Sequence, residues 1–288
     1  MVSIIRKLRR MKFDMSIDIT DSKTSRLLNR MVTAKIKVGY SPTERPLRRL
    51  ERQPANVLAK PFGVGEHFLD RYLSPLDALG FQAVIPSPSL APLPEKRDAA
   101  MALLHSVGLV PGRFIAVHAG ASFIGRQWQP ERFAVALDAL VEQTGLDVAL
   151  VGGPDERELT DAIRSMTSHG VVSLAGQCEL DVLLAVLASA RLFVGNESGP
   201  MHMAAAAGTP VVGLFGLTDP ARWGPVGVPS VAVRPTMPCP CVAPGVCKSD
   251  DPSKAFCVRR IEVDEVVNAT VSLLARTEDH NRSTTDPA

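Results

Sequence analysis

From residue 113 onward, short apolar runs alternate with longer amphipathic segments along the chain. Short apolar runs bounded by turn residues are typical of buried strands, and a period of three to four residues is typical of helices. We expect strands at 113–120, 147–153, 171–176, 191–196 and 210–216, with helices at 130–145, 155–166, 179–190 and 200–208. Such alternation predicts right-handed crossovers and a parallel, doubly wound α/β sheet.

The first ninety residues follow a shorter version of this pattern. A basic amphipathic helix is expected at 4–13, a strand at 13–20, a helix at 25–34 and a strand at 35–40. An α/β domain rarely begins with a helix that no strand precedes. We therefore expect an N-terminal domain that is incomplete at its start.

A proline-rich segment separates the two patterned regions. Four prolines fall within nine positions of the stretch 84–98, and such a run cannot continue a helix or a central strand. We take this stretch as the linker between domains. The expected divisions are a partial N-terminal domain at 1–92, a C-terminal domain at 93–275 and a disordered polar tail at 276–288.

The stretch 193–216 places a polar turn between a strand and a helix. Ser198 is suited to the N-cap, Pro200 to the first turn, and Gly208 to the helix end. Ligands of doubly wound sheets bind at the carboxyl ends of the strands, where free N–H groups and the helix dipole suit a phosphate. A purely structural capped helix remains the alternative, and His202 one turn later could also be structural.

A second connection, after the strand at 113–120, combines small residues with Ser122 and Arg126. Small residues allow close backbone approach, the hydroxyl can donate to an oxygen, and a guanidinium can bind a phosphate through two nitrogens. Taken alone, Arg126 could simply be solvated. Two such connections at neighbouring strand ends favour a diphosphate site. The turn 152–156 carries less information, because glycines and Asp155 there are ordinary turn residues.

Composition and charge limit the cellular location that we expect and the kinds of partner that the protein could bind. Hydrophobic residues make up 45% and charged residues 22%, and no run approaches the length of a membrane helix. The charged start does not resemble a signal peptide, so we expect a cytoplasmic protein. Residues 1–50 hold 13 Lys or Arg against 4 Asp or Glu, a charge of +9 within a total of +2. This excess is either a solvated helix face or a surface for an anionic partner, and the scarcity of aromatics beside it argues against single-stranded nucleic acid.

Four of the five cysteines, at 239, 241, 247 and 257, lie within nineteen residues. Four thiolates could bind zinc, but structural zinc sites more often use two Cys-x-x-Cys pairs. Disulfides are unexpected in the cytoplasm. Reduced loop cysteines are therefore favoured over a zinc site, and Cys178 is expected to be a small residue near the predicted site.

The motifs VHAGAS, RQWQPERF, ALVGGPDERELTDAI, SLAG and FVGNESGPMHMAAAAGTPVVGLFG resemble glycosyltransferase family 9, the ADP-heptose:lipopolysaccharide heptosyltransferases. The resemblance is strong over 113–270 and weaker over 6–40. It implies a GT-B architecture, with two Rossmann-like doubly wound parallel-sheet domains, the N-terminal one incomplete. In that architecture the C-terminal domain holds the nucleotide-sugar donor and the N-terminal domain holds the acceptor.

The resemblance also assigns residues to the donor. Ser122 and Arg126 would contact its diphosphate, with Arg126 where the family usually has lysine. Glu197 stands where the family most often has aspartate, so its carboxylate reaches one methylene further. The donor cradle would be completed by Asn196, Ser198, Gly199 and His202.

The implied chemistry is inverting, metal-independent transfer of a heptose or related sugar, with no cofactor beside the nucleotide-sugar co-substrate, ADP-heptose. The acceptor would be a lipid-linked saccharide of the lipopolysaccharide core, met by a monomer at the inner face of the inner membrane. The family's base is an aspartate in a Gly-Asp motif after the first strand, and this sequence has no such motif. Asp14 and Asp18 lie in a different strand pattern. A degenerate relative that only binds nucleotide, and a nucleotide-sugar epimerase, remain alternatives.

Overall fold

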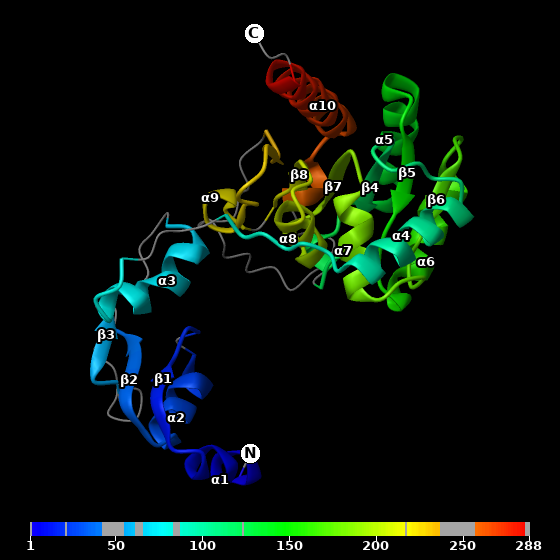
Figure 1. The fold of residues 1–288 in the computed structure, drawn as a ribbon. Coiled ribbons are helices and arrows are strands. Elements are labelled where there is room, and N and C mark those ends of the chain that lie inside the picture. The colour runs from blue at the N-terminus through cyan, green and yellow to red at the C-terminus, as the bar shows by residue number, and fades with distance from the viewer. Residues whose placement is uncertain are drawn as a thin grey trace. The chain divides into compact units, whose positions relative to one another are not determined.

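The structure is a computed structural model that describes residues 2–20, 22–41, 55–60, 66–82, 87–122, 124–216, 218–236 and 257–285 (Figure 1). The chain divides into two compact units, Met1–Pro86 and Ser87–Ala288. This division falls inside the proline-rich stretch that the sequence indicated as a linker, a few residues before the expected boundary at 92.

The first unit is built on a small parallel sheet with the strand order β1-β2-β3. The predicted helix and strand pattern of its first forty residues is confirmed, whereas β3 and α3 were not predicted. The N-cap of α2 is Ser22, whose side chain accepts a hydrogen bond from the Ser25 N–H. The described elements are α1 (Val2–Arg10), β1 (Phe13–Ile17), α2 (Lys23–Met31), β2 (Ala34–Tyr40), β3 (Val57–Ala59) and α3 (Phe68–Ala78).

The second unit is built on a six-stranded sheet, entirely parallel, with the order β6-β5-β4-β7-β8-β9. The sequence prediction of a doubly wound sheet is confirmed. Its strands are β4 (Phe114–His118), β5 (Asp147–Leu150), β6 (Val171–Ser173), β7 (Leu192–Asn196), β8 (Val211–Leu214) and β9 (Ser230–Val233). Its helices are α4 (Pro94–Ser106), η1 (Ile124–Arg126), α5 (Pro130–Thr144), η2 (Pro154–Glu156), α6 (Arg157–Met166), α7 (Leu180–Ala188), α8 (Gly199–Ala206), α9 (Pro220–Trp223), η3 (Cys257–Arg260) and α10 (Val263–Thr285).

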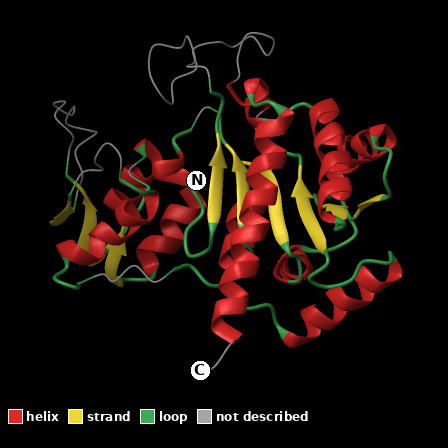
Figure 2. Ribbon diagram, turned by 90° about the horizontal axis from the view of Figure 1, so that it is seen from above, coloured by secondary structure: helices red, strands yellow, loops and turns green. Residues whose placement is uncertain are grey.

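Helices cover both faces of this sheet, so the central strands are buried along their whole length (Figure 2). Ile115 and Val117 of β4 point into a core shared with α5, α6 and α10. Phe114 and Ala116 point to the other face, into a core shared with α4, α7 and α8. Successive side chains of these strands face opposite sides of the sheet, and both sides are buried. This is why the sequences of β4 and β7 are continuous apolar runs.

Two expectations at the ends of the second unit were wrong. The stretch 84–98 was taken as linker, but Pro94 is the first residue of α4, a position where proline's missing N–H costs nothing. The tail from 276 was expected to be disordered, but α10 continues to Thr285. Among the helices of the described residues, none combines the length and apolarity that a membrane crossing needs.

Candidate functional site

The two connections that the sequence singled out follow neighbouring strands of the large sheet. β4 pairs with β7 in parallel, with His118 opposite Gly195 at the carboxyl ends. The connection 119–129 and the turn 197–198 therefore leave the sheet side by side. This geometry confirms that the two predicted loops lie at adjacent strand ends.

Asn196, the last residue of β7, holds these two connections together. Its Oδ1 accepts a hydrogen bond from the Trp128 N–H at 3.1 Å, and its Nδ2 donates to the Ala119 carbonyl at 2.7 Å. The side chain is fully buried. The sequence grouped Asn196 with the residues of a donor cradle, but in the structure its amide bonds to the main chain of the β4–α5 connection.

Ser198 occupies the N-cap of α8, as the sequence predicted, with an extended backbone (φ −159°, ψ 172°). Its side chain makes no capping hydrogen bond to the helix. The hydroxyl lies instead 3.0 Å from the Asn196 carbonyl oxygen and 3.0 Å from Nδ1 of His118. The N–H groups of the first turn of α8 are therefore left without the partner that an N-cap side chain usually supplies.

The start of α8 is not crowded by other described segments. Apart from its chain neighbours and its own helix backbone, no described residue has an atom within 4 Å of a Cβ placed on Gly199. Gly199 and His202 are both exposed, one turn apart on α8, and Ser122 is exposed on the β4–α5 connection. The helix end thus combines accessible N–H groups with the positive pole of the helix dipole, which is suited to an anion.

Arg126 and Glu197 form a loose ion pair beside the helix end. Arg126 Nη1 lies 3.7 Å from Oε1 of Glu197, and the Thr218 hydroxyl donates a hydrogen bond to Oε2. Glu197 is 6% exposed, and this burial raises the pKa of its carboxyl, with Thr218 and Arg126 acting in the opposite direction. Arg126 Nε is buried and has no hydrogen-bond partner among the described residues. The Arg126 side chain as a whole is 36% exposed and its pair with Glu197 is long, so the guanidinium keeps donor hydrogens that an incoming anion can reach.

The sequence reasoning missed two residues of this region, His118 and Glu156. His118 ends β4, is 4% exposed, and contacts Ser198 through Nδ1. Its Nε2 lies 3.1 Å from each carboxylate oxygen of Glu156. The hydrogen bond from His118 is the first cause that lowers the pKa of Glu156, and the Gly153 N–H adds to it at 2.8 Å from Oε2.

Two glycines make room for the Glu156 carboxylate. A Cβ on Gly120 would overlap Oε1 of Glu156, and a Cβ on Gly152 would lie 2.7 Å from Oε2. Both positions therefore require glycine while the carboxylate stays against the strand ends. The glycines in HAGAS and VGGPDE were the available signal, because glycine at a strand end often marks close approach of another group.

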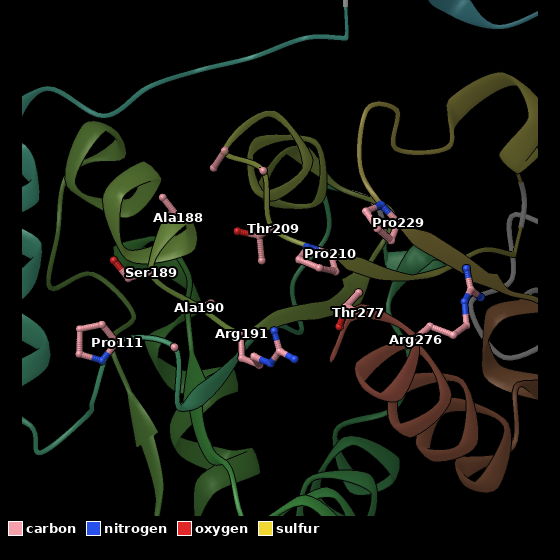
Figure 3. A pocket seen from close by; sticks show the side chains of 13 residues that line it. Pro111, Ala188, Ser189, Ala190, Arg191, Thr209, Pro210, Pro229, Arg276 and Thr277 are labelled. Carbon is pink, nitrogen blue, oxygen red and sulfur yellow. The ribbon is translucent and has the colours of Figure 1, made fainter. Parts of the chain in front are cut away.

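The opposite edge of the sheet holds a pocket of about 830 Å³. Small residues and prolines line most of it, together with Arg191 and Arg276 (Figure 3). Arg191 is already paired with Glu278 at 3.3 Å. The pocket lies at the amino ends of β4, β7, β8 and β9, so it does not include the residues that the sequence predicted to bind a donor.

No metal cluster of three or more His, Cys, Asp or Glu occurs within the described ranges. Cys239, Cys241 and Cys247 lie outside those ranges, and only the main chain of Cys257 is described, at the start of η3. The zinc and reduced-thiol alternatives for this cluster therefore remain predictions. Cys178 is a free, partly buried thiol.

Comparisons with known proteins agree on one family. The family model described as glycosyltransferase family 9 (heptosyltransferase) matches residues 1–245. Lipopolysaccharide heptosyltransferase 3 of Escherichia coli is 27% identical over 225 residues, which cover 77% of this chain and 65% of that protein. The protein of the same name from strain K12 is 30% identical over 227 residues, covering 78% and 64%. The chain therefore spans slightly less than two thirds of the length of these relatives.

Solved structures show a similar fold. A family 9 glycosyltransferase from Veillonella parvula superposes with a TM-score of 0.78 at 23% identity, covering 95% of this chain and 77% of that one. The ADP-heptose lps heptosyltransferase II of Escherichia coli gives 0.71 at 18% identity, covering 96% and 81%. These likenesses identify the fold as GT-B, with Rossmann-like parallel-sheet domains.

Proposed function

The chain belongs to glycosyltransferase family 9, and from this we propose that it is a glycosyltransferase whose second unit binds a nucleotide-sugar donor. The proposed donor is ADP-heptose and the proposed acceptor is the lipopolysaccharide core or a related glycan. The names of its relatives support the acceptor, since they are lipopolysaccharide heptosyltransferases, and the name of a structural neighbour, ADP-heptose lps heptosyltransferase II, supports the donor.

The observation that carries the proposal is the uncapped N-terminus of α8 beside Arg126. The Ser198 hydroxyl is directed away from the helix N–H groups, and no described atom fills the space at Gly199. Arg126 has a buried Nε without a partner among the described residues. A diphosphate placed here would receive main-chain N–H groups, the helix dipole and a guanidinium together.

The proposed roles of the predicted residues follow from these positions. Arg126, Ser122 and the first turn of α8, with Gly199 and His202, would contact the diphosphate. Asn196 would act indirectly, by fixing the β4–α5 connection against β7. Glu197 would hold Arg126 in place through their ion pair.

The proposed reaction is a single displacement in which an acceptor hydroxyl attacks the anomeric carbon and inverts its configuration. The nucleoside diphosphate leaves, and negative charge accumulates on it as the bond breaks. Arg126 and the α8 N-terminus would stabilise that charge without a metal ion. The base that removes the hydroxyl proton is not assigned to a residue of this chain.

The acceptor side of the proposal concerns the first unit. Its helix α1 carries Lys7, Arg9 and Arg10 in its last turn. We propose that this basic segment faces an anionic lipid-linked saccharide at the inner surface of the inner membrane, with the protein peripheral and monomeric. Nucleic acid is not a proposed partner.

The test is a transfer assay with ADP-heptose and heptose-deficient lipopolysaccharide, with and without EDTA. We expect ADP release and labelled acceptor in both conditions, and inverted anomeric configuration of the product by NMR. Arg126→Ala should reduce both signals, whereas Arg191→Ala, at the opposite edge of the sheet, should not. ADP binding without transfer would indicate a non-catalytic relative, and an epimerised sugar nucleotide without acceptor would indicate an epimerase. Absence of ADP binding would reject the proposal.

A further inference from the structure

His118 lies buried between the two connections that frame the candidate donor site. It is 4% exposed, and each ring nitrogen has a protein partner. Ser198 lies on one side and Glu156 on the other, at positions separated by 80 and 38 residues along the chain. A buried imidazole held at both nitrogens has its proton positions set by those partners.

The hydrogen-bond partners of the His118 ring allow two arrangements of its protons. The pKa of Glu156 is lowered, so its carboxylate is an acceptor, and Nε2 must carry a hydrogen toward it. The Ser198 hydroxyl has one hydrogen to donate and two possible partners at 3.0 Å, the Asn196 carbonyl and Nδ1 of His118. If the hydrogen goes to the carbonyl, Nδ1 must donate to Ser198, and the ring is an imidazolium. If it goes to Nδ1, the ring is neutral.

The two arrangements differ in the net charge of the His118–Glu156 pair. With a neutral ring, the Glu156 carboxylate keeps an unbalanced negative charge at the carboxyl ends of the strands. With an imidazolium, Glu156 and His118 form a neutral pair. Since a bound diphosphate brings further negative charge to the same edge of the sheet, its binding favours the imidazolium.

Among the described residues, no charged side chain other than His118 is paired with the Glu156 carboxylate. Arg126 on η1 is paired with Glu197, which follows β7. Arg157 on α6 donates its guanidinium hydrogens to the carbonyls of Ala175 and Gly176. Other charged or titratable side chains on the connections around His118 are Asp155 on η2 and His202 on α8.

We propose that His118 is a positioning residue for donor binding, becoming an imidazolium when a nucleoside diphosphate occupies the site. The inference rests on the proposed function, since it concerns the same diphosphate. The imidazolium cancels the charge of Glu156 and holds the Ser198 oxygen through Nδ1. Ser198 then donates to the Asn196 carbonyl, and the first-turn N–H groups of α8 stay available to the diphosphate.

The first test measures protons. Binding of ADP to the full chain is followed by calorimetry at about pH 8, in two buffers with different ionisation enthalpies. The wild type is expected to take up a proton on binding, and ring ¹⁵N shifts of His118 are expected to change to those of an imidazolium. His118→Asn, which keeps a hydrogen-bond donor near the Nδ1 position without a titratable ring, should lose the proton uptake. Equal uptake in this variant, or a neutral ring in the complex, would overturn the proposal.

The second test is a double-mutant cycle on ADP affinity. His118→Asn leaves Glu156 uncompensated, so ADP should bind roughly tenfold more weakly. His118→Asn combined with Glu156→Gln removes both charges and should recover most of that loss. Adenosine, which has no phosphate, should bind all variants alike. A double variant no better than His118→Asn would overturn the proposal, since the loss would then be structural.

The two proposals fail in different ways. A wild-type protein that binds no ADP at any pH rejects the donor site, and the role of His118 with it. ADP binding without proton uptake, and without rescue in the double variant, leaves the donor site standing and removes only the role of His118.

Discussion

The six-stranded sheet has a carboxyl edge, where its parallel strands end, and an amino edge, where they begin. The two edges differ in how deeply their ionisable side chains are buried and in how these are paired. At the carboxyl edge, His118 and Glu197 are 4% and 6% exposed, and their partners come from other connections. At the amino edge, the pocket presents Arg191 and Arg276, and Arg191 is paired with a Glu278 that is 57% exposed. Groups that are charged away from water cost free energy unless they are paired, so we place the proposed donor site at the edge that holds these buried ionisable side chains rather than at the edge with the pocket.

The largest expected effect of a single substitution concerns the residue that joins the two connections at the carboxyl edge. Asn196→Ala would leave the buried Trp128 N–H and the Ala119 carbonyl without their partner. Each unsatisfied buried group costs about 1–3 kcal/mol, so the two together should lower the free energy of unfolding by about 2–6 kcal/mol.

Thr209→Val is the matched variant at the amino edge. It removes one buried hydrogen bond, from the Thr209 hydroxyl to the Leu187 carbonyl, and should cost about 1 kcal/mol. Chemical denaturation of both variants checks the comparison. Equal losses would show that the carboxyl edge has no special network.

The next effect is on ligand affinity. Arg126→Ala removes a guanidinium beside the α8 N-terminus, whose pair with Glu197 is loose at 3.7 Å, whereas Arg191→Ala removes one at the opposite edge, paired with Glu278 at 3.3 Å. We expect ADP to bind about 1.5–3 kcal/mol more weakly to Arg126→Ala and with unchanged affinity to Arg191→Ala, by calorimetry. Unchanged affinity in Arg126→Ala would remove this residue from the site.

A smaller effect concerns the pH dependence of stability. The pKa of Glu156 is lowered in the folded protein, so its carboxylate contributes stability above its ordinary pKa of 4.5. That contribution is lost as the pH falls through the lower folded value. Glu156→Gln should therefore differ most from the wild type near neutral pH and converge with it in acid. Denaturation curves of both proteins from acid to neutral pH measure this difference in the free energy of unfolding. A difference that does not change with pH would contradict the role of the Glu156 carboxylate.

The smallest effect has the opposite sign. Burial raises the pKa of Glu197, so its ionisation costs stability as the pH rises from 4.5 through the folded value. Glu197→Gln keeps an oxygen that can accept from Thr218 and removes this cost. Relative to the wild type, the variant should gain stability across that window, by less than any of the effects above. A relative loss with rising pH would mean that the pair with Arg126 outweighs burial.

Much of the second unit could be predicted from the sequence. The strands from β4 to β8 were expected because buried parallel strands produce continuous apolar runs between amphipathic helices. The N-cap position of Ser198 was also expected, since serine before Gly-Pro is a strong local signal. Both features depend on neighbours in the sequence.

Contacts between distant segments were not predictable in the same way. Ser198 has the position of an N-cap, but its hydroxyl contacts His118, which lies at the end of the adjacent strand, instead of its own helix. The His118–Glu156 pair links two strand ends 38 residues apart, and only the strand order β5-β4-β7 brings them together. The helical tail was missed because its polar composition resembles that of a disordered end.

The most direct test of the account is an ADP titration of the ¹⁵N-labelled protein, followed through backbone amide NMR signals. A donor site at the α8 N-terminus predicts the largest shifts at Arg126, Gly199, Met201 and His202, at the carboxyl edge. Signals from Ala190, Arg191 and Gly208, at the amino-edge pocket, should stay in place. Shifts confined to the amino-edge residues, with the α8 N-terminus unchanged, would contradict the assignment of the donor site.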